Sequence, residues 1–120
     1  MRRMLTAGID IGSITTKAAL FEDGKLLATR LIFTGYNSET AGRKIFAEIM
    51  QAAGFQEAEQ IKIVSIGYGR ASVGFAQKAL TEITCHAAGA RYLNKSIRSV
   101  IDVGGQDSKV IKVDPEGKVL

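Results

Sequence analysis

The 120-residue sequence contains no tryptophan, one proline, one histidine and one cysteine. Because a disulfide needs two cysteines, the lone Cys85 excludes an internal disulfide and any metal site built on a cysteine pair. The lone His86 likewise excludes a metal site with several histidine ligands. We interpret Cys85 as a small buried residue first and as a ligand or redox group second. A chain without cysteine pairs is typical of a reducing compartment, so we expect a cytoplasmic protein.

Clustered charge and long apolar runs are also missing. Sixteen basic and twelve acidic residues give a net charge of +4, and no run of basic residues is longer than two. Nucleic-acid-binding proteins concentrate their lysines and arginines, so we expect no nucleic-acid partner. No apolar run approaches the ~20 residues that span a bilayer, so we expect no membrane segment. The composition, 46% hydrophobic and 23% charged, is that of one globular domain or one lobe of a larger one.

Several common signatures of nucleotide binding and catalysis are absent from the sequence. It has no P-loop, no serine elbow of the GxSxG type and no HExxH zinc helix. The stretch Gly67-Tyr68-Gly69 is not a dinucleotide fingerprint, because Ser72 stands where the third glycine belongs. A nucleotide site would therefore have to be built in another way.

Two similar stretches lie near the ends of the chain, GIDIGSITTK at 8–17 and IDVGGQDSK at 101–109. In each, an apolar strand carries one aspartate near its end, a glycine turn follows, and hydroxyl and lysine side chains begin the return strand. Glycine lets backbone N–H groups approach phosphate oxygens, lysine supplies a point charge, and an aspartate suits hydrated Mg²⁺. The alternative is a plain hairpin turn, but a carboxylate inside an apolar strand needs a partner.

The phosphate interpretation assigns a role to each polar residue of the two stretches. Mg²⁺ would be held through water by Asp10 and Asp102. ATP phosphates would be contacted by Gly12, Ser13, Thr15, Thr16, Lys17, Gly104 and Gly105.

Several further residues remain open between a functional and a structural role. Gln106 is a candidate for orienting an attacking water, or it caps the second turn. Glu82 and His86 lie four residues apart on one predicted helical face, and Glu82 is either a general base or a solvated residue at a helix N-terminus. Asp107 and Lys109 could instead form a surface pair.

Periodicity and turn residues predict a mixed α/β fold that opens with an antiparallel meander. Asp23-Gly24 is typical of a two-residue hairpin turn, and we expect Ser38 or Thr40 to cap the first helix and Gly54 to end it. Strands are expected at 4–11, 16–22, 26–33, 62–66, 98–103 and 108–114, and helices at 39–53, 71–79 and 82–94.

Four motifs together closely resemble the ATPase activators of 2-hydroxyacyl-CoA dehydratases and the ATPase subunits of benzoyl-CoA reductase, the BadF/BadG/BcrA/BcrD-type proteins. They are the two stretches above together with GYGR at 67–70 and EITCHA at 82–87. The first motif alone is shared with the wider actin, Hsp70 and sugar-kinase superfamily, whereas EITCHA and DVGGQDSK at 102–109 narrow the resemblance to this family.

The resemblance implies a ribonuclease-H-like lobe at 1–96 and the start of a second lobe at 97–120. It implies ATP with Mg²⁺ between the lobes of a homodimer that shares one [4Fe–4S] cluster. ATP hydrolysis would drive an electron from ferredoxin or flavodoxin, through the cluster, into an acyl-CoA dehydratase or reductase.

The sequence departs from this family chiefly in length. Family members are longer, and the cluster cysteines would lie beyond Leu120, so no iron–sulfur ligand is expected here. We therefore expect the N-terminal half of such a protein, inactive alone. Two alternatives share the superfold: a lobe of a small-molecule kinase of the sugar type, and a non-catalytic actin-like assembly lobe.

Overall fold

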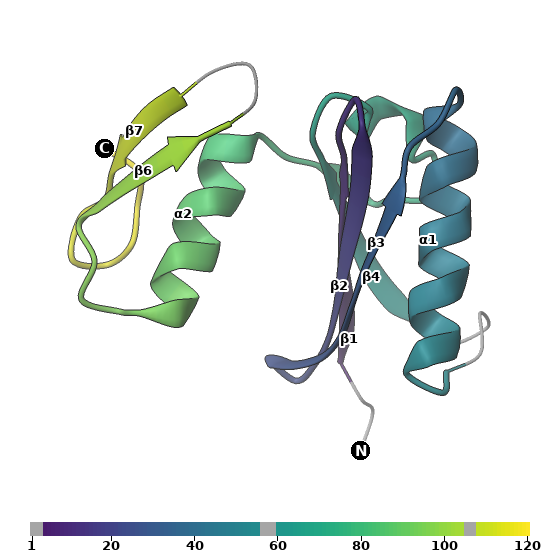
Figure 1. The fold of residues 1–120 in the computed structure, drawn as a ribbon. Helices are drawn as coiled ribbons and strands as arrows, with labels where there is room; N and C mark the ends of the chain where they lie inside the picture. Colours follow the sequence, from purple (N-terminus) through teal and green to yellow (C-terminus); the bar gives the residue numbers. More distant parts are fainter. Residues whose placement is uncertain (1–3, 56–59, 105–107) are drawn as a thin grey trace. The chain divides into compact units, whose positions relative to one another are not determined.

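The computed structural model describes residues 4–55, 60–104 and 108–120. The chain forms two compact units, Met1–Leu80 and Thr81–Leu120, called here the N-terminal and the C-terminal unit (Figure 1). The boundary between them comes before the predicted lobe boundary at residue 96, because the second α-helix packs within the C-terminal unit. The assignment of 1–96 and 97–120 to two lobes of a longer protein stays a prediction.

The N-terminal unit is a five-stranded mixed sheet with one α-helix on one face (Figure 1). The strand order is β3-β2-β1-β4-β5, with β1–β2 and β2–β3 antiparallel and β1–β4 and β4–β5 parallel. The predicted opening meander is therefore confirmed. The strands are β1 (Leu5–Ile11), β2 (Thr15–Glu22), β3 (Lys25–Phe33), β4 (Ile61–Ile66) and β5 (Lys78–Ala79), and the helix is α1 (Ser38–Ala52).

Alternation along the central strands decides which face α1 covers. On β1 every second residue from Leu5 to Ile11 is buried, and Asp10 lies on the other face. The helix contributes a stripe at helical spacing, in which Ile45 and Ile49 are fully buried. The turn between β2 and β3 has positive φ at Asp23 (50°) and Gly24 (82°), as the hairpin signal predicted. The apolar core therefore packs against one face of β1, and Asp10 lies on the opposite face.

The first helix begins one residue earlier than expected and has a different cap. The Asn37 side chain accepts a hydrogen bond from the Thr40 backbone N–H at 3.1 Å, so the prediction of Ser38 or Thr40 as the cap was wrong. Asparagine caps a helix as well as serine does, and its position one residue upstream satisfies the same orphan donors. Gly54 follows the helix with a φ of +80°, in agreement with its predicted role as the stop.

The helix predicted at 71–79 is wrong. Only a short 3₁₀ turn, η1 (Arg70–Ser72), forms there, and the chain then extends into β5. β5 pairs in parallel with Val64 and Ser65 of β4. The helical propensity of this segment is weak because it contains Gly74, and the strand pairing is therefore the more stable arrangement. The side chain of Gln77 continues this edge, accepting from the Ile63 N–H and donating to the Ile61 carbonyl.

The C-terminal unit contains α2 (Glu82–Leu93) and a two-stranded antiparallel hairpin, β6 (Ser99–Val103) and β7 (Ser108–Lys112). Thr81 caps α2 by accepting a hydrogen bond from the Thr84 N–H. Its buried apolar cluster is small, formed by Ala87, Ile111 and Val113. Neither described α-helix combines the length and apolar character that crossing a bilayer requires.

Candidate functional site

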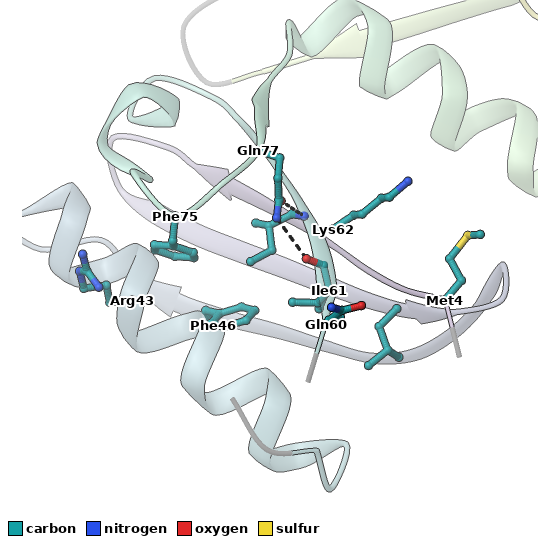
Figure 2. Close-up of a pocket in the computed structure, with 10 residues that line it drawn as sticks. Met4, Arg43, Phe46, Gln60, Ile61, Lys62, Phe75 and Gln77 are labelled. Atoms are coloured by element: carbon teal, nitrogen blue, oxygen red, sulfur yellow. Dashed lines mark hydrogen bonds between the residues drawn. The ribbon is translucent and has the colours of Figure 1, made fainter. Parts of the chain in front are cut away.

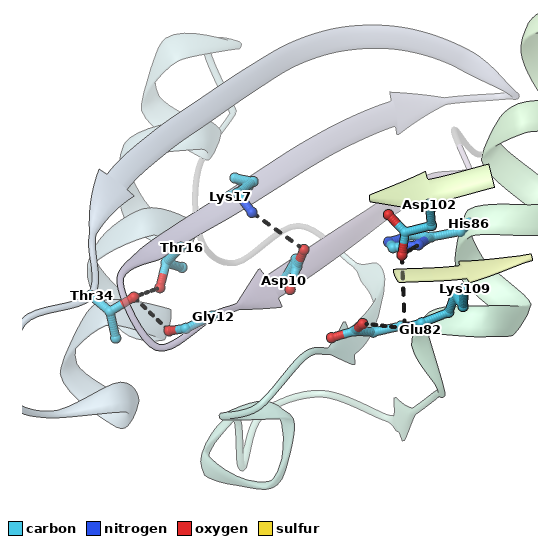
Figure 3. Close-up of polar contacts among 9 residues, drawn as sticks. All are labelled: Asp10, Gly12, Thr16, Lys17, Thr34, Glu82, His86, Asp102 and Lys109. Carbon is cyan, nitrogen blue, oxygen red and sulfur yellow. Dashed lines mark hydrogen bonds and ion pairs between the residues drawn. The ribbon is translucent and has the colours of Figure 1, made fainter. Parts of the chain in front are cut away.

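The two predicted hairpins have the same register in three dimensions. Asp10 lies directly opposite Lys17 in the β1–β2 pair, and Asp102 lies directly opposite Lys109 in the β6–β7 pair. Opposite residues in an antiparallel pair project to the same side of the sheet. In both hairpins the lysine Nζ is 3.7 Å from the aspartate Oδ2 (Figure 3). Each aspartate thus has a cationic partner, which explains how an apolar strand accommodates the carboxylate.

The turn of the first hairpin is fixed by a residue that the sequence analysis missed. Thr34, just after β3, donates its hydroxyl hydrogen to the Gly12 carbonyl at 2.8 Å, and its N–H donates to the Ile14 carbonyl at 2.8 Å. Since a hydroxyl has only one hydrogen, Thr16 must be the donor in the 2.8 Å contact between the Thr16 and Thr34 hydroxyls (Figure 3). The signal was the Thr-Gly pair directly after the third predicted strand, which we interpreted only as a loop.

Predicted phosphate residues of the first hairpin divide between its two faces. Thr16 is fully buried and its hydroxyl is bonded to Thr34, so it supports the turn from the core side. Ser13 and Lys17 are exposed, and Gly12 and Thr15 are half-buried. The Gly12 N–H donates to the Thr15 carbonyl at 2.9 Å and closes the turn.

The loop that follows β4 packs closely against the end of β1. Because β1 and β4 are parallel neighbours, with Asp10 opposite Ile66, Gly67 arrives beside the aspartate. A Cβ on Gly67 would overlap Asp10 Oδ1 and lie 2.7 Å from the Ile11 carbonyl oxygen, and its φ is +93°. The Gly69 N–H donates to that same carbonyl at 2.8 Å, and a Cβ on Gly69 would lie 2.6 Å from Ile11 Cγ2. Both glycines of the GYGR motif are therefore required by close approach to the β1 end.

The second hairpin is held from α2 as well as by its own lysine. His86 Nδ1 is 3.1 Å from Asp102 Oδ2, and Lys109 Nζ is 3.2 Å from Glu82 Oε2 (Figure 3). The four side chains are half-buried, between 22% and 41% exposed. Lys109 contacts the carboxylates of Glu82 and Asp102, while its predicted pairing with Asp107 falls outside the described residues. Gly104 is exposed, whereas Gly105, Gln106 and Asp107 lie outside the described residues.

Each hairpin offers one carboxylate to a metal ion, Asp10 in the first and Asp102 in the second. Among the described residues no group of three or more acidic, histidine or cysteine side chains is arranged to hold a metal ion. One aspartate at each hairpin fits hydrated Mg²⁺, which keeps several waters and takes one or two carboxylates. It does not fit a dehydrated ion that needs a full protein cage. Cys85 is partly exposed on α2 and more open than the predicted buried residue.

A pocket of about 730 Å³ lies elsewhere in the N-terminal unit, between α1 and the β4 edge (Figure 2). The Phe46 and Phe75 ring centroids lie 5.4 Å apart there with the ring planes tilted by 44°, and the Arg43 guanidinium lies 5.6 Å from the Phe75 centroid. None of the predicted phosphate or metal residues lines this pocket. It is therefore separate from the hairpin site within this unit.

Residues 7–120 match the BadF/BadG/BcrA/BcrD ATPase family. The chain belongs to this family. It is 36% identical over 117 residues to the activator of lactoyl-CoA dehydratase from Anaerotignum propionicum, covering 97% of this chain and 45% of that protein. Homologues of the chain are thus activators of 2-hydroxyacyl-CoA dehydratases, as the four motifs predicted.

Solved structures agree with the family and with the predicted fold. The chain matches component A of (R)-2-hydroxyglutaryl-CoA dehydratase from Acidaminococcus fermentans with a TM-score of 0.88 and 34% identity, over 97% of this chain and 45% of that one. It matches the activator of 2-hydroxyisocaproyl-CoA dehydratase from Clostridium difficile with bound ADPNP with a TM-score of 0.84 and 35% identity, over 98% and 44%. The chain therefore spans less than half the length of these relatives.

A more distant likeness extends to the fold of another enzyme. A hexokinase from Thermus thermophilus matches with a TM-score of 0.64 at 18% identity, which shows the fold alone. The predicted fold class, an α/β lobe of the actin, Hsp70 and sugar-kinase superfold, is confirmed.

Proposed function

We propose that the chain is the phosphate-binding part of an ATPase that couples ATP hydrolysis to low-potential electron transfer into a 2-hydroxyacyl-CoA dehydratase or a related reductase. The observation that carries this proposal is the shared register of the two hairpins, each with an aspartate opposite a lysine beside a glycine turn. A family of ATPases and a relative with bound ADPNP support the same conclusion.

In this proposal one set of residues binds the hydrated metal ion and another set binds the phosphates. Asp10 and Asp102 accept hydrogen bonds from the water shell of Mg²⁺, whose charge offsets that of the phosphate oxygens when it is bound. Backbone N–H groups at the turns and the two lysines contact phosphate oxygens. The residues proposed for these contacts are Gly12, Ser13, Thr15, Lys17, Gly104, Gly105 and Lys109, with Thr16 acting beneath the turn. Gln106 stays the candidate for orienting the attacking water.

The remaining parts of the proposal concern a longer protein of which this chain would form the N-terminal half. We propose a cytoplasmic homodimer that shares a [4Fe–4S] cluster, accepts electrons from ferredoxin or flavodoxin and passes them to the dehydratase. None of the cluster ligands is assigned to this chain, whose one cysteine lies on α2. The adenosine contacts and the cluster are assigned to the C-terminal part that the relatives carry, so the 120-residue chain alone is proposed to be inactive.

The test is calorimetric titration with Mg·ATP of the 120-residue chain, and of a protein in which it is followed by the C-terminal part. We expect only the longer protein to bind tightly. Asp10→Asn and Asp102→Asn should each weaken its affinity at least about tenfold, the loss typical when a metal's supporting group is removed. Asp23→Asn, at the opposite end of β2, is the charge-matched control and should bind normally. Unchanged affinity in both hairpin variants would refute the metal and phosphate assignment.

A further inference from the structure

A polar cluster connects α2 to the second hairpin, and the hairpin pattern itself does not require it. Glu82 and His86 lie one turn apart on α2, and they contact Lys109 of β7 and Asp102 of β6 respectively (Figure 3). Residues four apart on a helix share a face, so the two contacts act together. The helix therefore holds the anionic and the cationic member of the same cross-strand pair.

The chemistry of the side chains identifies the donor and the acceptor in each contact. A carboxylate has no hydrogen to give, so Nδ1 of His86 must carry the proton in its 3.1 Å contact with Asp102 Oδ2. That bond sets the tautomer and the ring orientation of the imidazole. The Lys109 ammonium is shared between Glu82 Oε2 at 3.2 Å and Asp102 Oδ2 at 3.7 Å. Among the described residues both partners of Asp102 thus fall on Oδ2, and Oδ1 is the oxygen that remains for the water shell of a metal.

The first hairpin provides an internal comparison. Its Asp10–Lys17 pair has the same 3.7 Å separation, but among the described residues no helix adds a second ion pair or a histidine to it. Lys17 is 50% exposed, whereas Lys109 is 22% exposed. The cluster on α2 is therefore an addition to one hairpin and not a general feature of the motif.

We propose that Glu82 and His86 are positioning residues, which hold Lys109 and Asp102 in the orientation that metal and phosphate need at the second hairpin. This inference rests on the proposed function. In it Glu82 is not a general base, because its carboxylate is engaged by the Lys109 ammonium. His86 acts through Asp102, in the way that outer-shell partners orient the groups around a metal.

The contact itself can be tested first, because His86 is the only histidine in the 120 residues. Every imidazole resonance in a nuclear magnetic resonance spectrum of the chain therefore comes from this residue. Asp102→Asn should shift the imidazole nitrogen resonances, whereas Asp10→Asn, the equivalent change in the first hairpin, should leave them unchanged. Identical His86 resonances in the wild type and in Asp102→Asn would overturn the proposal.

The positioning role is tested in the longer protein described above for Mg·ATP binding. His86→Leu should raise the dissociation constant of Mg·ATP about tenfold, the lower end of the loss seen when an outer-shell partner is removed. His86→Asn, which keeps a nitrogen donor near the Nδ1 position, should restore most of the affinity. Binding of ATP without Mg²⁺ should be equal in all three proteins, because the imidazole acts through the metal's aspartate.

The outcomes separate this inference from the proposed function. If the two hairpin aspartates matter but His86→Leu binds Mg·ATP like the wild type, the positioning role is wrong and the proposed function stands. If Asp10→Asn and Asp102→Asn bind normally, the proposed function itself fails. Equal weakening with and without Mg²⁺ would reduce His86 to a structural residue and overturn the inference.

Discussion

Replacing Thr34 with valine is the sharpest test of how the first hairpin is held. Valine keeps the branched shape of threonine and removes only the hydroxyl. The change deletes the 2.8 Å hydrogen bond to the Gly12 carbonyl and the acceptor of the Thr16 hydroxyl, while the backbone bond from the Thr34 N–H to the Ile14 carbonyl remains. The perturbation is therefore local to the underside of the phosphate turn.

The magnitude follows from the burial of the two partners. Thr16 is 0% exposed, so its orphaned donor cannot find water and costs about 1–3 kcal/mol. The Gly12 carbonyl belongs to a half-buried residue that water can reach, so its lost bond costs about 0.5–1 kcal/mol. We expect Thr34→Val to lower the free energy of unfolding of the N-terminal unit by about 1.5–4 kcal/mol.

A double-mutant cycle isolates the orphaned donor as the cause. Thr16→Val removes the donor and leaves only an under-used acceptor on Thr34, so it should cost about 1 kcal/mol. In the double variant no donor is orphaned, and its loss of stability should be clearly smaller than the sum of the single losses. Urea unfolding followed by far-ultraviolet circular dichroism gives all three values. Strict additivity, or a loss below about 0.5 kcal/mol for Thr34→Val, would refute the reasoning.

Two further predictions concern close approach and the sheet edge in the same unit. Gly67→Ala forces a Cβ against Asp10 at a φ of +93°, so urea unfolding should show a loss of about 1–3 kcal/mol and calorimetry of the longer protein weaker Mg·ATP binding. Gly8→Ala, where a Cβ meets no atom within 4 Å, is its control and should change neither. Gln77→Leu removes both side-chain bonds to the β4 edge, so it should cost about 1–2 kcal/mol and speed hydrogen exchange at the Ile63 amide. Unchanged exchange there would show that the edge does not depend on Gln77.

The antiparallel meander and α1 could be predicted because local signals agreed with one another. Alternating apolar residues on β1, the Asp23-Gly24 turn and the apolar stripe from Ile45 to Ile49 each point to one element and one face. Their information lies within a few residues of the element that they specify. The end of α1 at Gly54 has the same local origin.

Predictions failed where a distant partner decided the outcome. The segment 71–79 has helical propensity, but Lys78 and Ala79 gain a strand partner in Val64 and Ser65, which no local pattern announces. The contact of Lys109 with Glu82, which is 27 residues away along the chain, was likewise not predicted. Thr34 was missed for the same reason, since its partners lie across the turn of the first hairpin.

The two hairpins share a register but obtain their rigidity from different sources. Asp10 sits on a central strand whose other face is fixed by the buried core of the N-terminal unit, and Thr34 and Gly67 fix the surrounding backbone. The C-terminal unit has a much smaller apolar cluster, built from Ala87 and two β-strand residues. A small core constrains a helix weakly, so the polar contacts from α2 must contribute a larger share of the order around Asp102. A change that tilts α2 should therefore reach Asp102 directly, while Asp10 remains held by its sheet.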